Sequence, residues 1–254
     1  MRNFIDFSGK KMVVIGASSG IGKQTAIALS SLGAQLILVA RREEQLQNTM
    51  ALLEGSGHGY YAADIAKLDE TEDLFKNISK TYGTIDGLVY CAGVNSTLPL
   101  LQLKPDKLHD IFTVNFFAFV ETVRQATRRG RFSEGMRIVA VSSNAAIRGD
   151  KAHTAYSASK AAMNAAIRCI AKELADKGIC INAVAPAVTN TEVYQNYVAV
   201  SGGISDSEKA LLERQYMGLI EPQDIAEAII YLLSPAARMI TGITLPVDGG
   251  ITTN

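Results

Sequence analysis

The sequence predicts an α/β fold in which parallel strands form one sheet and helices cover both of its faces. Short runs of Val, Ile and Leu alternate along the chain with longer amphipathic stretches. Strands that are apolar on both sides are typical of a parallel sheet, because helices bury both of its faces. No Pro/Ser/Gly-rich linker, charge run or internal repeat divides the 254 residues, so we expect a single domain over 1–254.

The first two strand–helix pairs are marked by their ends. The apolar run 12–16 predicts the first strand, and Gly33 ends the helix expected over 21–32. A second apolar run, 36–40, precedes a helical stretch over 43–53. That stretch opens with two glutamates, which are favourable in the first turn of a helix.

The middle of the chain continues the same alternation. A strand is expected over 59–63 and a helix over 68–82. The apolar run 87–92 predicts the fourth strand. A long helix is expected over 105–129, because proline is favoured in a first helical turn and the stretch after it is amphipathic.

The last third supplies three more strands and two helices. The apolar runs 137–141, 178–185 and 243–247 predict the strands. The helix over 156–177 contains no Gly or Pro, and the helix over 222–233 begins with a proline.

Residues 189–218 interrupt this alternation. The segment contains three tyrosines, a methionine and a Gly-Gly pair, and it lies between a strand and a helix. An excursion of this size is typical of a lid or a binding element. A surface excursion without such a role is the alternative, and we expect a substrate lid over 189–218.

Composition excludes several classes of function. Lys+Arg and Asp+Glu both number 25, so no global field recruits nucleic acid or an anionic membrane. The three cysteines lack CxxC spacing and the three histidines are scattered, so no metal site is expected. The first residues are too short and polar a stretch for a signal peptide, and no apolar run reaches about 18 residues. We therefore expect a cytoplasmic protein.

A glycine-rich loop follows the first predicted strand and opens the first helix. It contains Gly16, Gly20 and Gly22 in a GxxxGxG spacing instead of the common GxGxxG. Glycines let backbone approach a pyrophosphate, and a helix N-terminus offers free N–H groups and the positive end of its dipole. Between the first strand and the first helix of a parallel α/β chain, the loop predicts dinucleotide binding.

The end of the second strand indicates which dinucleotide. An acid there would bond the ribose 2′-hydroxyl of NAD, but this chain has Arg41 and Arg42. An arginine, with Ser18 nearby, is suited to a 2′-phosphate, so the sequence favours NADP(H) over NAD(H). The alternative is that the arginines are solvated beside Glu43 and Glu44.

Tyr156 and Lys160 are the candidate chemical groups. Residues four apart on a helix share a face, so both side chains are expected to point the same way. A nearby ammonium favours a phenolate and lowers the pKa of a tyrosine, which then exchanges protons with a substrate oxygen. A solvated pair on a helix surface is the alternative.

These residues, taken in order, resemble the short-chain dehydrogenase/reductase family over 11–250. The resemblance implies a Rossmann-type, doubly wound sheet of seven parallel strands and NAD(P)(H)-dependent interconversion of a carbonyl and an alcohol. It also implies a catalytic set of Asn115, Ser143, Tyr156 and Lys160.

The resemblance extends to the contacts of cofactor and substrate. The implied cofactor contacts are Gly16, Ser18, Ser19, Gly20, Ile21, Gly22, Arg41, Arg42, Asp64, Ile65, Ala92, Gly93, Asn115, Tyr156, Lys160, Pro186, Val188, Thr189 and Thr191. The expected substrate contacts are Asn95, Ser143, Ala145, Tyr156, Ala187 and Tyr194.

Three sites depart from the usual family residues. Tyr90 and Cys91 stand where asparagines are common, which removes a hydrogen bond that braces the sheet. Ala187 replaces a glycine, and its methyl is expected to narrow the nicotinamide side of the pocket or to stiffen the loop. Cys180 replaces an arginine. None of these changes removes a catalytic group.

Hydride transfer between NADP(H) and a carbonyl or secondary alcohol is thus the predicted function. A small ketone, a sterol-like ketone and a 3-oxoacyl thioester all fit as substrates. A non-catalytic NADP(H)-binding regulatory protein is the alternative, and the complete catalytic set argues against it. A sugar-nucleotide epimerase or dehydratase fits the short chain and its loop less well. The resemblance also implies a homotetramer or homodimer, with the long helices packed across the interfaces.

Overall fold

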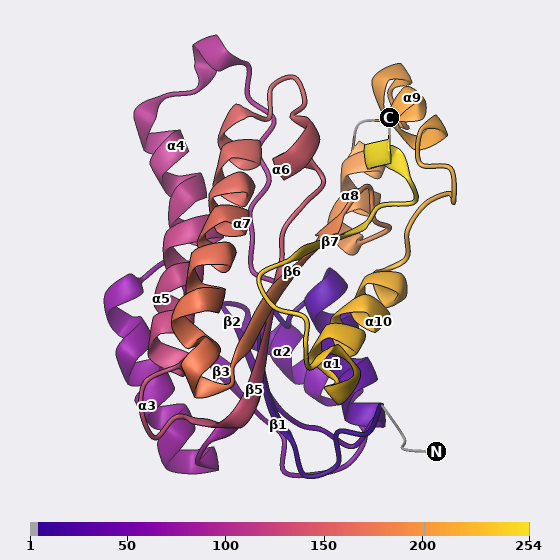
Figure 1. Ribbon diagram of the computed structural model, residues 1–254. Helices are drawn as coiled ribbons and strands as arrows, with labels where there is room; N and C mark the ends of the chain where they lie inside the picture. Colours follow the sequence, from indigo (N-terminus) through magenta and orange to yellow (C-terminus); the bar gives the residue numbers. More distant parts are fainter. Residues whose placement is uncertain (1–4, 201, 254) are drawn as a thin grey trace.

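A seven-stranded parallel sheet forms the centre of the described part of the chain (Figure 1). The computed structural model describes residues 5–200 and 202–253. The strands are β1 (Lys11–Ile15), β2 (Gln35–Ala40), β3 (Gly59–Ala62), β4 (Ile85–Tyr90), β5 (Phe132–Val141), β6 (Cys180–Pro186) and β7 (Thr244–Val247). They lie in the order β3-β2-β1-β4-β5-β6-β7, and every pair is parallel. This confirms the predicted Rossmann-type sheet.

Helices cover both faces of the sheet, as expected (Figure 1). One face carries α1 (Gly20–Ser31), α2 (Glu43–Met50) and α10 (Pro222–Leu233). The other carries α3 (Thr71–Tyr82), α4 (Pro105–Phe112), α5 (Ala118–Ala126) and α7 (Thr154–Leu174). Three short helices lie outside these layers: α6 (Ala145–Arg148), α8 (Glu192–Val200) and α9 (Asp206–Glu213). Of the described helices, none is long and apolar enough to cross a membrane.

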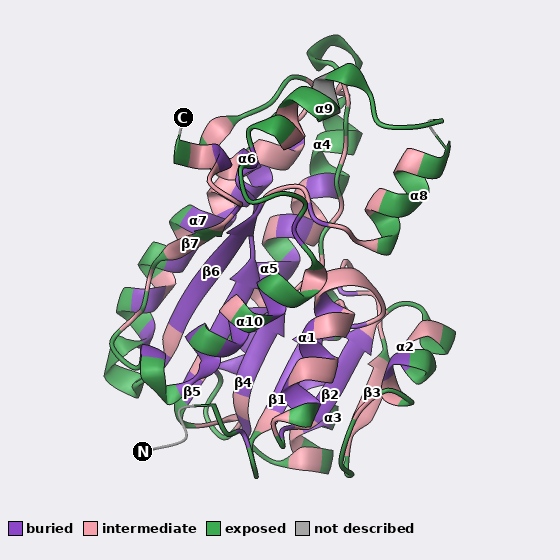
Figure 2. Cartoon of the chain, turned by 90° about the vertical axis from the view of Figure 1, so that its right-hand side faces the viewer, coloured by how far each residue is buried: buried purple, intermediate pink, exposed green. Residues whose placement is uncertain are grey.

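Two apolar cores lie between the sheet and the helix layers. Alternate residues of a strand point to opposite faces, so Val13 packs in one core and Val14 in the other. Figure 2 shows the central strands as the buried layer and the outer sides of the helices as exposed. Burial of one such aliphatic side chain stabilises the fold by about 1.5–3 kcal/mol. The continuous apolar runs of the strands therefore hold both helix layers in place.

The long helix predicted over 105–129 differs from the prediction in its interior and its end. A π-helical turn, Thr113–Phe117, separates α4 from α5. Such a turn inserts one extra residue into the helix and is frequently found at functional sites. The helix ends at Ala126, because the chain turns through Gly130 into a fifth strand that begins earlier than expected.

The segment 189–218 is largely helical and contains α8 and α9, which the sequence analysis did not predict. None of the residues of α8 is buried. Figure 2 shows α8 set apart from the helix layers, above the N-terminal end of α1. Its role as a substrate lid stays a prediction.

Candidate active site

A cavity of about 370 Å³ opens at the carboxyl edge of the sheet, where the strand order reverses between β1 and β4. Ligands of open α/β sheets bind at this point, because the loops after the two strands diverge there. The loops after β1, β2, β3 and β4 line it, together with part of 191–193. The lining residues are Ile15, Gly16, Ser18, Ser19, Gly20, Ile21, Gly22, Val39, Ala40, Arg41, Arg42, Ala63, Asp64, Ile65, Cys91, Ala92, Gly93, Val94, Val114, Thr191 and Val193.

Glycine is required in the loop after β1 for close backbone packing. Gly16 has φ +84°, and a Cβ on it would lie 2.7 Å from the Ala92 nitrogen. A Cβ on Gly22 would collide with the carbonyl oxygen of Gly16. The loop therefore folds tightly against the end of β4 and presents its backbone to the cavity. This geometry fits the pyrophosphate loop that the spacing predicts.

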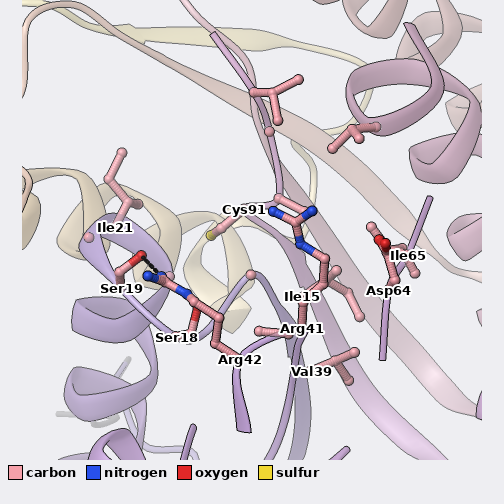
Figure 3. Close-up of a pocket in the computed structure, with 18 of the residues that line it drawn as sticks. Ile15, Ser18, Ser19, Ile21, Val39, Arg41, Arg42, Asp64, Ile65 and Cys91 are labelled. Atoms are coloured by element: carbon pink, nitrogen blue, oxygen red, sulfur yellow. Dashed lines mark hydrogen bonds between the residues drawn. The ribbon is translucent and has the colours of Figure 1, made fainter. Parts of the chain in front are cut away.

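The first turn of α1 is suited to an anionic group. It contains no acidic residue, and the N-cap residue Ser19 makes no side-chain capping bond. Arg42 Nη2 lies 3.2 Å from Ser18 Oγ and 3.1 Å from Ser19 Oγ, which brings a guanidinium beside the loop (Figure 3). Arg41 also lines the cavity. Positive charge and hydroxyl donors thus gather where the sequence predicts phosphate groups.

Asn115 lies in the π-helical turn and is fully buried. Its Oδ1 accepts a hydrogen bond of 2.8 Å from the Val94 nitrogen. Its Nδ2 donates to the Val94 oxygen and to Ser159 Oγ, both at 3.0 Å. The carboxamide thus joins the π-helical turn to α7 and to the loop after β4, and it fixes the wall of the cavity next to Lys160.

Lys160 is buried beneath the same wall. Its Nζ donates a hydrogen bond of 2.8 Å to the Val141 oxygen, at the end of β5. A Cβ on Gly93 would lie 3.3 Å from Lys160 Nζ and 3.4 Å from Asn115 Oδ1. Burial lowers the pKa of the Lys160 ammonium to about 8, and the Cys91 thiol opposes this effect. The ammonium is therefore held behind a glycine, within reach of a ligand at Gly93.

Ser143 and Tyr156 form the second half of the predicted set. Ser143 follows β5, and its Oγ accepts a hydrogen bond of 3.1 Å from the Ala145 nitrogen. Burial raises the pKa of Tyr156, and a side-chain hydrogen bond with Ser143 opposes that rise. Burial therefore outweighs any lowering of the Tyr156 pKa of the kind that the helical spacing suggests.

Several predicted contacts lie outside the cavity lining. Among the expected cofactor contacts these are Asn115, Tyr156, Lys160, Pro186, Val188 and Thr189, and none of the expected substrate contacts lines it. Ala187 packs against the apolar core on the α10 side of the sheet. Asn95 is exposed, and its Oδ1 accepts a hydrogen bond from the Ser96 nitrogen at 2.7 Å. These residues stay predictions as ligand contacts.

Several lining residues were not among the predicted contacts, and Cys91 and Val193 are two of them. Burial raises the pKa of the Cys91 thiol to about 12, so this cysteine is a neutral part of the wall. Val193 reaches the cavity from α8, which no local pattern predicts.

Tyr90 replaces the hydrogen bond that the missing asparagines remove. Its side chain is fully buried, and its hydroxyl donates to the Val114 oxygen at 2.6 Å. Val114 lies in the π-helical turn next to Asn115. The phenol thus braces β4 against the turn that contains Asn115. The tyrosine before the Ala-Gly pair is the only local sign of this hydrogen bond. Its partner could not be predicted, because Val114 is distant in sequence.

Tyr90→Phe is expected to lower the free energy of unfolding by about 1 kcal/mol, because it leaves the partly buried Val114 carbonyl without this donor. Urea denaturation followed by circular dichroism measures this change. Tyr61→Phe is the matched control, since its hydroxyl makes a longer, exposed bond of 3.4 Å to Thr81. Equal stabilities of the two variants would contradict the bracing role of Tyr90.

Comparison with known proteins agrees with this site. A family model described as Enoyl-(Acyl carrier protein) reductase matches residues 16–252. Carbonyl reductase family member 4 of Danio rerio is 33% identical, over 94% of this chain and 96% of that protein. L-xylulose reductase of Caenorhabditis elegans is 34% identical, over 98% of both.

A solved structure gives the same result. The crystal structure of a dehydrogenase/reductase from Sinorhizobium meliloti 1021 has a TM-score of 0.88 and 31% sequence identity, and covers 98% of this chain and 97% of that one. The fold, the glycine loop at the carboxyl edge and these similarities lead to one family. The chain belongs to the short-chain dehydrogenase/reductase family of NAD(P)(H)-dependent oxidoreductases.

Proposed function

We propose that the protein is an NADP(H)-dependent oxidoreductase that interconverts a carbonyl compound and a secondary alcohol, with Tyr156 as the general acid and base. The observation that carries the proposal is the arrangement of Ser143, Tyr156 and Lys160. Ser143 and Tyr156 share a hydrogen bond, and the Lys160 ammonium lies buried behind Gly93, which lines the cavity. This arrangement combines a proton donor, an oxygen-binding hydroxyl and a fixed positive charge.

The residues at the cavity fit the dinucleotide. The first turn of α1 and the loop after β1 would hold the diphosphate, since both present backbone N–H groups. Arg41 and Arg42 would hold the 2′-phosphate, and Asp64 would contact the adenine end. When bound, the nicotinamide supplies or accepts the hydride, and the protein supplies position and electrostatics.

Ser143 and Tyr156 act on the oxygen of the substrate. In the reduction direction the Ser143 hydroxyl donates a hydrogen bond to the carbonyl oxygen and holds it beside Tyr156. The Tyr156 hydroxyl then gives its proton to that oxygen as negative charge develops on it. Burial raises the pKa of Tyr156, so the phenol carries this proton at neutral pH.

Lys160 and Asn115 support this step from behind. The Lys160 ammonium would bind the nicotinamide ribose hydroxyls and favour the phenolate after the proton has left. Asn115 fixes the helix turn beside the ammonium through three hydrogen bonds. By family resemblance, the asparagine also holds a water that returns protons from solvent to Lys160.

The substrate is a neutral carbonyl compound in this proposal. The relatives named above include a carbonyl reductase and an L-xylulose reductase, so ketones and keto sugars belong in the first test. A panel of ketones, keto sugars and oxoacyl thioesters, assayed with NADPH and NADH by absorbance, identifies the class. If NADPH binds and no member of the panel or its alcohol product is turned over, the non-catalytic alternative replaces this proposal.

Replacing Arg41 and Arg42 together by alanine is expected to weaken NADPH binding by about tenfold to a hundredfold, because charged hydrogen bonds to the 2′-phosphate are lost. NADH binding is expected to stay within about twofold, since NADH lacks that phosphate. Titration by cofactor fluorescence measures both. Arg129→Ala, at an exposed arginine, is the control. An equal loss for both cofactors would contradict the role of the two arginines.

Assembly and location extend the proposal. A homotetramer or homodimer stays a prediction, with α4, α5 and α7 as the packing helices. Phe117 is 37% exposed and Leu108 is 38% exposed on the α4–α5 surface, and such an interface would cover them. A cytoplasmic location also stays a prediction.

A further inference from the structure

Glu192, the first residue of α8, reaches the N-terminal end of α1. Its Oε2 accepts a hydrogen bond of 2.8 Å from the Gly20 nitrogen, the first residue of that helix. Its Oε1 lies 4.0 Å from Lys23 Nζ. The first turn of α1 has no acid of its own, and Ser19 does not cap it by its side chain. The carboxylate at this positive helix end therefore comes from a segment far away in sequence.

The same helix end is where the cavity offers backbone donors to a diphosphate. Gly20 and Ile21 line the cavity, as do Thr191 and Val193 on either side of Glu192. A carboxylate and a diphosphate in one place repel each other and compete for the same N–H groups. Glu192 thus holds one of the donors that the anionic ligand would use.

Hydrogen bonds connect the start of α8 and the residues before it to the rest of the protein. None of its residues is buried. Next to the helix, Asn190 Nδ2 donates to Glu221 Oε1 at 2.9 Å, and Gln195 Nε2 donates to Asn190 Oδ1 at 3.0 Å. A segment with few buried apolar contacts moves at low cost in free energy. The bond from Gly20 is one of the contacts that hold the start of α8.

We propose that Glu192 is an internal competitor for the cofactor diphosphate, which makes cofactor binding and the position of α8 mutually dependent. The proposal rests on the proposed function, in that the anionic ligand is NADP(H). An anion at the end of α1 displaces the carboxylate and releases the start of α8. Reciprocally, the carboxylate lowers the affinity of the site for any diphosphate. Thr191 and Val193 move with it, because they flank Glu192 in the chain.

The test compares Glu192→Gln with Glu213→Gln, which removes the same charge from an exposed site at the end of α9. The probes are NADPH, by its fluorescence, and inorganic pyrophosphate, by calorimetry. Glu192→Gln is expected to bind both about fivefold more tightly, a modest change because the Glu192 side chain is 51% exposed. Glu213→Gln is expected to match the wild type. Unchanged affinities of Glu192→Gln for both probes would overturn the proposal.

Hydrogen exchange of α8 supplies a readout that a purely structural cap would not change. In the wild type, pyrophosphate is expected to speed exchange over 192–200. In Glu192→Gln this segment is expected to exchange fast already, with no further response. Slower or equal exchange of the wild type with pyrophosphate would overturn the proposal.

The two probes separate this proposal from the proposed function. Tighter pyrophosphate binding by Glu192→Gln, in a protein that does not bind NADPH, supports the competition and removes NADP(H) as its ligand. Turnover with NADPH, together with unchanged affinities in the variant, supports the oxidoreductase and removes the competition.

Discussion

Tyr156→Phe is expected to lower turnover by about a thousandfold, the usual loss when a general acid is removed. The phenol hydroxyl is bonded to Ser143, and burial keeps its proton in place by raising its pKa. Phenylalanine preserves the ring and its packing but has no proton to give. Steady-state kinetics with NADPH and the best substrate of the panel measure the loss.

Two further measurements make this result specific. NADPH affinity of Tyr156→Phe is expected to stay within about threefold, because a single hydroxyl contact is lost. Tyr231→Phe, at a tyrosine that is 43% exposed on α10, is the matched control and is expected to keep full turnover. Near-normal turnover of Tyr156→Phe would refute the mechanism.

Lys160→Met is expected to lower kcat/KM by about a hundredfold to a thousandfold, the usual effect of removing a fixed charge from a catalytic site. Methionine fills a similar volume without the ammonium, so the buried position stays packed. Kinetics with varied NADPH separate the loss of cofactor binding from the loss of turnover. Lys172→Met, at an exposed lysine of the same helix, controls for the substitution. A loss below tenfold for Lys160→Met would contradict the role of Lys160.

The same variant tests the burial of the ammonium through pH. In the folded protein the pKa of Lys160 is lowered from 10.5 to about 8. Between these values the unfolded chain binds more protons than the native one, so the free energy of unfolding rises with pH. Relative to Lys160→Met, the wild type is expected to gain about 3 kcal/mol across this window. Denaturation curves at pH 8 and above measure the difference, and parallel curves would contradict the lowered pKa.

Much of the fold was predictable because its signals are local. Continuous apolar runs predicted the positions of the strands. The position of Gly16 and Gly20 between a strand and a helix predicted the loop that lines the cavity. The spacing of Tyr156 and Lys160 on one helix was also correct. The direction of the Tyr156 pKa was not predictable in this way, because burial raises it and burial depends on the assembled fold.

The remaining features depend on contacts between distant residues. The π-helical turn at Asn115 lies in a stretch whose sequence pattern predicts an ordinary helix. The hydrogen bond that braces this turn comes from Tyr90 on β4. Glu192 meets Gly20 across 172 positions of sequence. No periodicity or short motif encodes such pairings, so they become visible only in the assembled fold.

The strand order also has a consequence for the way the chain folds. β1 pairs with β4 at Met12 and Gly87, so the centre of the sheet closes only after a long stretch of chain is available. Pairings between residues so far apart form slowly, because the chain loses the entropy of loop closure before the new contacts stabilise the pair. During synthesis, β1 can pair first with β2, while its other edge stays unpaired until β4 has been made. That apolar edge is the segment most exposed to aggregation until about ninety residues have left the ribosome.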